Sequence, residues 1–295
     1  MTNNPIFKGA ATALVTPLNE KGVDYEAFGR LIDWQIESGI DALVIAGTTG
    51  EGSTLTDEEH RDVLRFSVER ANKRVPIIAG TGSNDTAYAI DLTKFACDIG
   101  ADAMLVVTPY YNKATQNGLI KMYNAIADAS TKPLILYNVP SRTGVNIEPA
   151  TYAALADHPN IRGIKEANGN LSKIVETAAL VGDKLDIYSG NDDQITPILT
   201  MGGSGVISVL SNLLPKETHD ICYKCFAGDV AGSMAMQCRY LPLIKALFSE
   251  VNPIPVKAAM AAMGYGEDYL RLPLTPMEDK NKTVLLGEMK KAGVI

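Results

Sequence analysis

The sequence predicts an α/β protein, a (β/α)8 barrel followed by a C-terminal helical region. Three observations support this prediction: eight short apolar runs recur along the chain, segments with helical spacing lie between them, and the alternation stops after residue 212. Continuous hydrophobicity is typical of strands that are covered on both faces. A doubly wound sheet has the same alternation, but eight units within the ~250 residues typical of the barrel favour the barrel.

The predicted strands are short runs rich in valine, isoleucine and leucine. In chain order they span residues 11–16, 42–47, 75–80, 103–108, 133–138, 162–167, 185–190 and 205–210. The segments between them have the spacing of helices. Residues 24–39 open on Asp24 and close on Gly39, and residues 56–73 open on Thr56. These residue types favour helix starts and ends.

The pattern changes after residue 212. Three further segments, residues 214–250, 252–265 and 278–293, are predicted to be helical with no strand between them. We therefore divide the chain into a barrel that carries the site, residues 1–212, and a C-terminal helical region, residues 213–295.

The composition excludes several classes of protein. A formal net charge of −7 argues against a nucleic-acid partner, because neutralising phosphates requires clustered lysine and arginine. The chain does not open on a basic segment followed by an apolar run, and no apolar stretch approaches the ~20 residues of a membrane helix. Four cysteines are too few for a disulfide framework in a chain of 295 residues. We expect a soluble, cytoplasmic protein with no membrane partner.

One segment has the spacing of a metal or redox site. His219, Cys222 and Cys225 lie close together in the sequence HDICYKC. No second such group exists in the chain, and the segment has the pattern of a half-buried helix. The structural interpretation is therefore favoured over a zinc site.

Polar residues gather where the predicted strands end. In a barrel the active site lies at the carboxyl ends of the strands, so these residues are expected to converge on one face. Any one of them alone would be interpreted as a capped turn or a buried tyrosine, and only their convergence indicates a site. They are Thr16, Thr48, Thr49, residues 80–84, Thr108, Tyr110, Tyr111, Tyr137, Asn138, Lys165, Glu166, Ser189 and Gly190.

Lys165 stands out because it lies inside an apolar strand. It is either a snorkelling or salt-bridged lysine, with Glu166 as an obvious partner, or a desolvated amine that can attack a carbonyl. Adjacent residues of a strand point to opposite faces, so we expect Glu166 not to pair with it. A lysine that points into the barrel is a candidate nucleophile.

Carbon–carbon bond formation at an enol carbon can use a metal ion or a lysine imine as the electron sink. The three histidines, His60, His158 and His219, do not end predicted strands. The metal route therefore lacks its usual ligands, and we expect no metal and no other cofactor.

The imine route requires a proton shuttle and groups that hold carboxylates. Tyr137 ends the strand next to that of Lys165, and its phenol could pass protons through the hydroxyls of Thr48 and Tyr111. Arg142 follows in the segment YNVPSRTG, where a guanidinium could bind a carboxylate, although a surface arginine is the alternative.

Nine ordered motifs that include these residues closely resemble those of the dihydrodipicolinate synthases, also called 4-hydroxy-tetrahydrodipicolinate synthases. The resemblance covers essentially the full length, and so many motifs in order are highly specific. The motifs are ALVTP, GTTGE, IAGTGSN, VTPYYN, LYNVPSRTG, GIKEANGN, GGSGVIS, NPIPVK and LRLPLTPM.

The resemblance implies a class I lyase of the lysine and diaminopimelate pathway, which condenses pyruvate with L-aspartate 4-semialdehyde and releases water. On this mapping Lys165 forms the Schiff base with pyruvate and Tyr137 shuttles protons. Thr48 and a Tyr111 from a neighbouring subunit complete the relay, which implies a dimer or a tetramer. The substrate-binding positions that match are Thr49 for the pyruvate carboxylate, Gly190 and Ile207 at the border of the ligand, and Arg142 for the semialdehyde carboxylate.

Two alternatives remain. Sibling aldolases, such as N-acetylneuraminate lyase and the keto-deoxy sugar acid aldolases, share the barrel, the lysine and the tyrosine. The neuraminate lyases resemble the segment around Arg142 only up to the proline and lack the arginine. A non-catalytic barrel that binds a keto acid would be expected to lose Lys165 or Tyr137, and both are present.

The family's regulatory lysine pocket maps to a dimer interface. At position 88, lysine-sensitive members carry a glutamate whose charge complements the ammonium of the effector, and Tyr88 cannot supply that charge. We therefore expect weak or absent inhibition by L-lysine. The matching positions are Gly52, Ser53, Asp57, His60, Asn84, Tyr88 and Tyr110.

Overall fold

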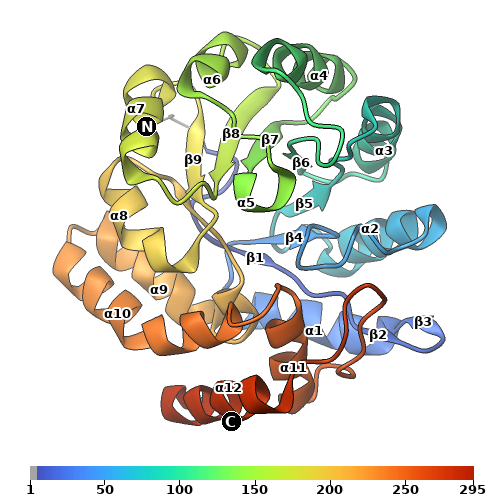
Figure 1. Cartoon of the computed structure of the whole chain (residues 1–295), viewed down its shortest axis with the longest axis vertical. Coiled ribbons are helices and arrows are strands. Elements are labelled where there is room, and N and C mark those ends of the chain that lie inside the picture. Colours follow the sequence, from blue (N-terminus) through green and yellow to red (C-terminus); the bar gives the residue numbers. More distant parts are fainter. Residues whose placement is uncertain (1–4) are drawn as a thin grey trace.

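The computed structural model describes residues 5–295, in which eight parallel strands close into a barrel. The order around the barrel is β1-β10-β9-β8-β7-β6-β5-β4 (Figure 1). Each barrel strand therefore pairs with the barrel strands before and after it in the sequence, and β1 pairs with β10 to close the barrel. The predicted (β/α)8 barrel is confirmed and the doubly wound sheet is excluded. The barrel strands are β1 (Gly9–Ala13), β4 (Ala42–Ile45), β5 (Ile77–Gly80), β6 (Ala103–Val107), β7 (Leu134–Asn138), β8 (Ile161–Glu166), β9 (Asp186–Ser189) and β10 (Gly205–Ser208).

Each predicted strand differs from the observed strand by one to three residues at one or both ends. The run at 11–16 contributes β1, which begins earlier, because Gly9 already pairs with Gly205. The run at 75–80 contributes β5, which begins only at Ile77. A short hairpin, β2 (Leu18–Asn19) with β3 (Gly22–Val23), has no counterpart in the prediction.

Helices follow the strands around the outside of the barrel. Asp24 caps the first by accepting from the backbone N–H of Ala27, and Thr56 and Glu59 form a reciprocal capping box at the second, so both predicted starts are confirmed. The outer helices are α1 (Tyr25–Glu37), α2 (Asp57–Ala71), α3 (Thr86–Asp98), α4 (Gln116–Asp128), α5 (Pro140–Thr143), α6 (Pro149–Leu155), α7 (Leu171–Val181) and α8 (Ile195–Thr200).

The C-terminal region is helical, as predicted. Figure 1 shows its helices, in orange to red, lying together on one side of the barrel. They are α9 (Pro215–Phe226), α10 (Val230–Leu247), α11 (Ile254–Ala262) and α12 (Asp279–Ala292). Short 3-10 turns, Asp192–Gln194 and Leu210–Asn212, follow β9 and β10.

The core has two layers because successive side chains of a strand point to opposite faces. The larger cluster lies between the strands and the outer helices. The smaller cluster fills the barrel and includes Tyr137, Tyr188 and Ile207. The register aligns Tyr137 with Lys165 and Lys165 with Tyr188, so Lys165 shares the inner face with both tyrosines.

Candidate active site

Lys165 lies inside the barrel near the carboxyl end of β8. Its side chain is buried, and its Nζ lies 4.2 Å from the centre of the Tyr137 ring. Among residues 5–295, no hydrogen-bond acceptor and no carboxylate lies within bonding distance of this amine. The structure therefore does not support the salt-bridged alternative.

Glu166 points away from Lys165, as the alternation along the strand predicts. Its carboxylate accepts hydrogen bonds from Asn138 Nδ2 at 3.0 Å, from the Tyr152 hydroxyl at 3.1 Å and from the backbone N–H of Asn168 at 2.9 Å. Glu166 thus belongs to the layer outside the barrel.

The surroundings of Lys165 favour a neutral amine. Burial lowers its pKa to about 7, the carboxylate of Asp192 raises that pKa, and the guanidinium of Arg142 lowers it. Asp192 is itself fully buried and accepts from the backbone N–H groups of Val209 at 3.0 Å and Leu210 at 2.9 Å. At neutral pH a large share of the amine is therefore deprotonated and able to act as a nucleophile.

Tyr137 is a proton donor beside this amine. Burial raises the pKa of its phenol, whereas Arg142 and the hydroxyl of Thr48 lower it. The phenol is therefore protonated at neutral pH, and Thr48 lies close enough to act on it. The structure brings Tyr137 and Thr48 together as the sequence predicts.

Tyr111 does not complete a relay within one chain. It lies on the loop after β6 with 93% of its surface exposed, and its φ of 68° is in the left-handed region that bulky residues rarely adopt. Among the described residues it makes no hydrogen bond with Thr48 or Tyr137. Within one chain Tyr111 therefore lies apart from Thr48 and Tyr137, and its contribution from a neighbouring subunit stays a prediction.

A residue that the sequence analysis missed connects two predicted binding residues. Asn252 Nδ2 donates to Thr49 Oγ1 at 2.9 Å, and the Asn252 carbonyl accepts from Arg142 Nη2 at 3.0 Å. The Oδ1 atom of Asn252 is buried and has no partner in residues 5–295. The motif NPIPVK contains this residue, but nothing in the sequence shows that it returns to the carboxyl ends of β4 and β7.

The remaining predicted binding positions lie at the same end of the barrel. Ile207 belongs to the inner cluster, and the backbone N–H of Gly190 donates to the Glu166 carbonyl at 2.7 Å. A Cβ at Gly190 would lie 2.7 Å from the Cβ of Ala167, so the close approach of the two loops requires glycine.

A cavity of about 390 Å³ opens beside these residues, lined by Thr48, Tyr137 and Arg142. Lys165 does not line it, but the ring of Tyr137 does, and this ring contacts the amine. Arg142 is exposed and faces this cavity, so it is not an ordinary surface arginine.

The same cavity is lined by five predicted regulatory positions, Gly52, Ser53, His60, Tyr88 and Tyr110. The Tyr88 hydroxyl donates to Asp57 Oδ1 at 3.0 Å, and the other carboxylate oxygen of Asp57 accepts from Arg61 at 2.9 Å.

Asn84 and His60 both contact backbone carbonyl groups. Asn84 donates to the Tyr110 carbonyl at 3.2 Å, and His60 Nε2 lies 2.9 Å from the Gly80 carbonyl, where burial lowers the pKa of the imidazole. Gly52 approaches the backbone so closely that a Cβ there would lie 2.2 Å from the Ala46 carbonyl oxygen.

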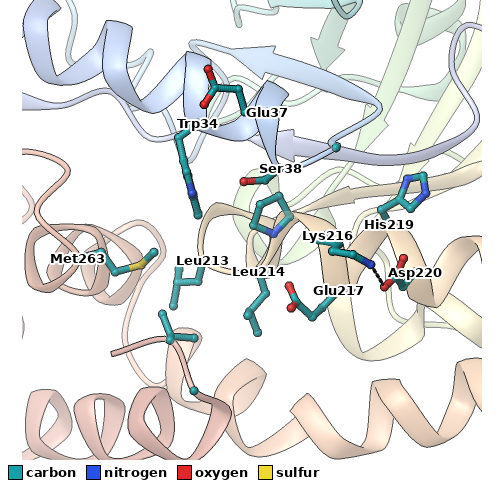
Figure 2. A pocket seen from close by; sticks show the side chains of 14 residues that line it. Trp34, Glu37, Ser38, Leu213, Leu214, Lys216, Glu217, His219, Asp220 and Met263 are labelled. Carbon is teal, nitrogen blue, oxygen red and sulfur yellow. Dashed lines mark hydrogen bonds and ion pairs between the residues drawn. The ribbon is translucent and has the colours of Figure 1, made fainter.

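A second cavity, of about 650 Å³, lies elsewhere, between the end of α1 and the start of α9. Figure 2 shows Trp34, Leu213 and Leu214 around it. Lys216 Nζ and Asp220 Oδ2, at its edge, form an ion pair with a distance of 2.5 Å. None of the predicted catalytic residues lines this cavity. Size alone therefore does not locate the active site.

The segment with metal-like spacing lies in α9. His219 Nδ1 lies 2.9 Å from Asp41 Oδ2, and Cys222 is fully buried in the outer core. Within residues 5–295, no group of three or more His, Cys, Asp or Glu side chains is placed to hold a metal ion. The geometry fits a helical face.

A family model, the dihydrodipicolinate synthetase family, matches residues 6–292. The chain belongs to this family. A 4-hydroxy-tetrahydrodipicolinate synthase of Clostridium perfringens is 54% identical over 290 residues, which cover 98% of this chain and 100% of that relative.

Solved structures of the dihydrodipicolinate synthetase family superpose closely on this chain. A dihydrodipicolinate synthase from Acinetobacter baumannii complexed with pyruvate is 45% identical with a TM-score of 0.96, covering 98% of this chain and 99% of that one. An enzyme from Cyanidioschyzon merolae with lysine bound is 38% identical with a TM-score of 0.95, covering 99% of this chain and 100% of that one.

Proposed function

We propose that this chain condenses pyruvate with L-aspartate 4-semialdehyde through a Schiff base on Lys165, giving 4-hydroxy-tetrahydrodipicolinate in lysine and diaminopimelate biosynthesis. The observation that carries the proposal is the buried amine of Lys165, which has no partner among the described residues and contacts the ring of Tyr137. Membership of the dihydrodipicolinate synthetase family supports the substrates and the pathway.

The amine begins the reaction in its neutral form. It attacks the keto carbon of pyruvate, and the carbinolamine then loses water when its hydroxyl accepts a proton. The phenol of Tyr137, protonated because burial raises its pKa, is placed to supply this proton, and the nearby Thr48 hydroxyl can replace it. The protonated imine then withdraws electrons from the methyl group, which loses a proton to the Tyr137 phenolate and attacks the aldehyde as an enamine, and the alkoxide that forms takes that proton back. The amino group of the semialdehyde then adds to the imine carbon and displaces Lys165, which closes the ring and frees the amine.

Two carboxylates must be held during this reaction. Thr49 is proposed to bind that of pyruvate, and Gly190 and Ile207 border the ligand. Arg142 is proposed to bind that of the semialdehyde, because its guanidinium lines the cavity and only one of its nitrogens is committed to Asn252. The reaction on this route needs no metal and no other cofactor.

The test of the proposal is borohydride reduction in the presence of pyruvate, followed by peptide mapping. We expect an adduct on the peptide that contains Lys165 and formation of product when L-aspartate 4-semialdehyde is added. Protein that stays unmodified at Lys165 would overturn the imine. Adduct formation with cleavage of N-acetylneuraminate or a keto-deoxy sugar acid, and no condensation, would assign the chain to the sibling aldolases. Adduct formation without any turnover would favour a keto-acid sensor.

We also propose that the chain self-associates as a dimer or a tetramer. Tyr111 projects into solvent in a strained conformation, which supports a role in a neighbouring subunit. Helix α7 exposes Leu171 and Val175, which lie one turn apart on the same face and are apolar side chains of the kind that interfaces cover.

Mixing two inactive variants tests the shared site. A Tyr111→Phe subunit keeps Lys165, and a Lys165→Ala subunit keeps Tyr111. If Tyr111 acts across the interface, mixing and reassociating the two variants restores part of the activity. No recovery, with hybrids verified by mass spectrometry, would contradict a shared site.

We also propose a location for the enzyme, the cytoplasm. No helix within residues 5–295 is long and apolar enough to cross a membrane. Together with the net charge of −7 and the small-molecule substrates, this supports a cytoplasmic enzyme without a membrane or nucleic-acid partner.

Regulation by L-lysine is proposed to be weak. The matching pocket positions Ser53, His60, Asn84, Tyr88 and Tyr110 carry no carboxylate. Asp57, whose carboxylate the Tyr88 hydroxyl contacts, already accepts from Tyr88 and Arg61. An effector ammonium would therefore lack the charge that the glutamate of sensitive relatives supplies.

A further inference from the structure

The strands β7 and β8 carry the catalytic pair on one face and a buried polar pair on the other. Their register aligns Tyr137 with Lys165 inside the barrel and Asn138 with Glu166 outside it. Each residue of the outer pair directly follows a residue of the inner pair in the chain. A shift of either strand would therefore move both pairs together.

The outer pair is joined by side chains as well as by the backbone. Asn138 Nδ2 donates to both carboxylate oxygens of Glu166, at 3.0 and 3.2 Å. The Tyr152 hydroxyl, from α6, donates to Glu166 Oε2 at 3.1 Å. We call Asn138, Tyr152 and Glu166 the outer-face clamp.

The ladder beneath the clamp is irregular. Leu134 pairs with Ile161, but the next residue, Ile135, pairs with Gly163, so the register skips position 162 of β8. Such a bulge shifts the register and bends the strand that contains it. On the carboxyl side of the bulge, the hydrogen bonds of the clamp join β7 to β8 and so support the alignment of Tyr137 with Lys165.

The clamp is costly to bury. Asn138, Tyr152 and Glu166 each expose 1% or less of their surface, and burial raises the pKa of Glu166 to about 7. An apolar residue of similar volume would avoid this cost, and the bound carboxylate touches neither Lys165 nor the cavity. A role in fixing the strand ends accounts for a polar group at this position.

We propose that the outer-face clamp is a positioning device, which holds Lys165 against Tyr137 and thereby sets the rate of imine formation. This inference rests on the proposed function of Lys165. The three clamp residues act through the strand ends and make no contact with substrate, so they are positioning residues. Misplacement by a fraction of an ångström is sufficient for a large effect on a proton transfer between two side chains.

The chain supplies a matched control for the clamp. Tyr152→Phe removes one hydroxyl that bonds Glu166, and Tyr123→Phe removes one hydroxyl that lies 3.4 Å from the Val106 carbonyl. Both tyrosines are fully buried in the same outer layer, on α6 and α4. Each change removes one buried phenol hydroxyl, and only Tyr152→Phe removes a bond to the clamp. Because a bond to a carboxylate is worth more than a bond to a neutral carbonyl, Tm is compared for both variants.

The experiment measures the rate of borohydride-trapped adduct at saturating pyruvate, together with kcat, KM and Tm. We expect Tyr152→Phe to slow trapping and kcat by roughly tenfold with KM for pyruvate within about twofold, and Tyr123→Phe to leave both rates within about twofold. Glu166→Gln should act in the same direction, and the double variant Tyr152→Phe/Glu166→Gln should fall short of the product of the single effects because the groups act as a unit.

Amide hydrogen exchange tests the clamp without depending on enzyme activity. Tyr152→Phe should increase exchange in peptides that cover the ends of β7 and β8, and Tyr123→Phe should not. Equal trapping rates in the two tyrosine variants, or unchanged exchange at these strand ends, would overturn the clamp. Absence of an adduct in the unaltered protein would instead overturn the proposed function, and exchange would still decide on the clamp.

Discussion

Two lysines are buried at the carboxyl end of this barrel, and they differ in their partners. Lys257, 2% exposed, donates from Nζ to the Thr16 carbonyl at 2.7 Å and to Glu51 Oε1 at 2.8 Å. Lys165, 6% exposed, has the face of Tyr137 beside its amine and no acceptor within bonding distance among residues 5–295. Both lysines are thus buried, but only Lys257 has a carboxylate and a carbonyl bound to its amine.

The difference shows what identifies a reactive amine. Burial lowers the pKa of both lysines, but at Lys257 the carboxylate of Glu51 opposes this effect in direct contact. A cation in contact with an anion is held in its charged form and has no free lone pair. Lys257 therefore fits a structural role, and Lys165 is the proposed nucleophile.

The largest expected effect separates the two lysines in a single assay. Lys165→Ala should abolish the borohydride adduct with pyruvate and lower kcat by at least about a thousandfold, because the nucleophile is gone. Lys257→Met should still give the adduct, measured by peptide mass spectrometry on folded protein. An adduct that persists in Lys165→Ala would show that another amine reacts.

The second effect is on stability. Lys257→Met leaves Glu51 buried without its cation, which should lower the free energy of unfolding by ~3–5 kcal/mol in urea titrations. Adding Glu51→Gln to that variant should recover part of the loss. A Lys257→Met protein as stable as the unaltered chain would contradict the structural role.

The third effect depends on pH. The pKa of Lys165 falls from 10.5 in the unfolded chain to about 7 in the folded one, so the folded protein binds fewer protons between these values. The stability contributed by Lys165 is therefore fully present above pH 10.5 and is lost as the pH falls through 7. Lys165→Met should exceed the unaltered protein in unfolding free energy at pH 6, by at most a few kcal/mol. The difference should shrink as the pH approaches 10.5, and a gap that widens there would reverse the sign.

A smaller effect concerns the carboxylate that acts on Lys165 from a distance. Asp192→Asn removes the charge that raises the pKa of the amine, so the acid limb of the profile of kcat/KM for pyruvate should move to lower pH, by roughly one unit or less. The exposed neighbour provides the control: Asp193→Asn should leave the profile in place. Equal shifts in both variants would indicate a general change in surface charge.

The smallest effect concerns the ammonium group of free L-lysine, which, like that of Lys257, needs a carboxylate partner. L-Lysine should inhibit weakly or not at all, because Tyr88 and Arg61 already occupy the carboxylate of Asp57. Tyr88→Glu should strengthen inhibition by adding an anion for the ammonium of the effector. Strong inhibition of the unaltered enzyme at sub-millimolar L-lysine would contradict this prediction.

The barrel and the inward direction of Lys165 follow from the sequence for a simple reason. Strands that are covered on both faces leave continuous apolar runs, and alternation along the run at 162–167 places Lys165 and Glu166 on opposite faces. Both inferences use neighbours in the chain. The hairpin of β2 and β3 escaped because strands of two residues each show no periodicity.

The supporting contacts of the site could not be predicted in this way. Asn252 lies 203 positions from Thr49 and 110 from Arg142, and Asp192 acts on Lys165 from a different strand end. Nothing local distinguishes these residues from ordinary turn asparagines and aspartates. The solvent exposure of Tyr111 could not be predicted from the sequence either, because it depends on the conformation of a loop.

The links made by Asn252 and Lys257 have a consequence for the order in which the enzyme is synthesised. A nascent chain leaves the ribosome with all eight strands and Lys165 complete well before these two residues emerge. Until they do, Thr49, Arg142 and Glu51 lack the groups that hold them. Competence is therefore acquired late in translation, and a fragment released early would contain the reactive amine without a formed substrate pocket.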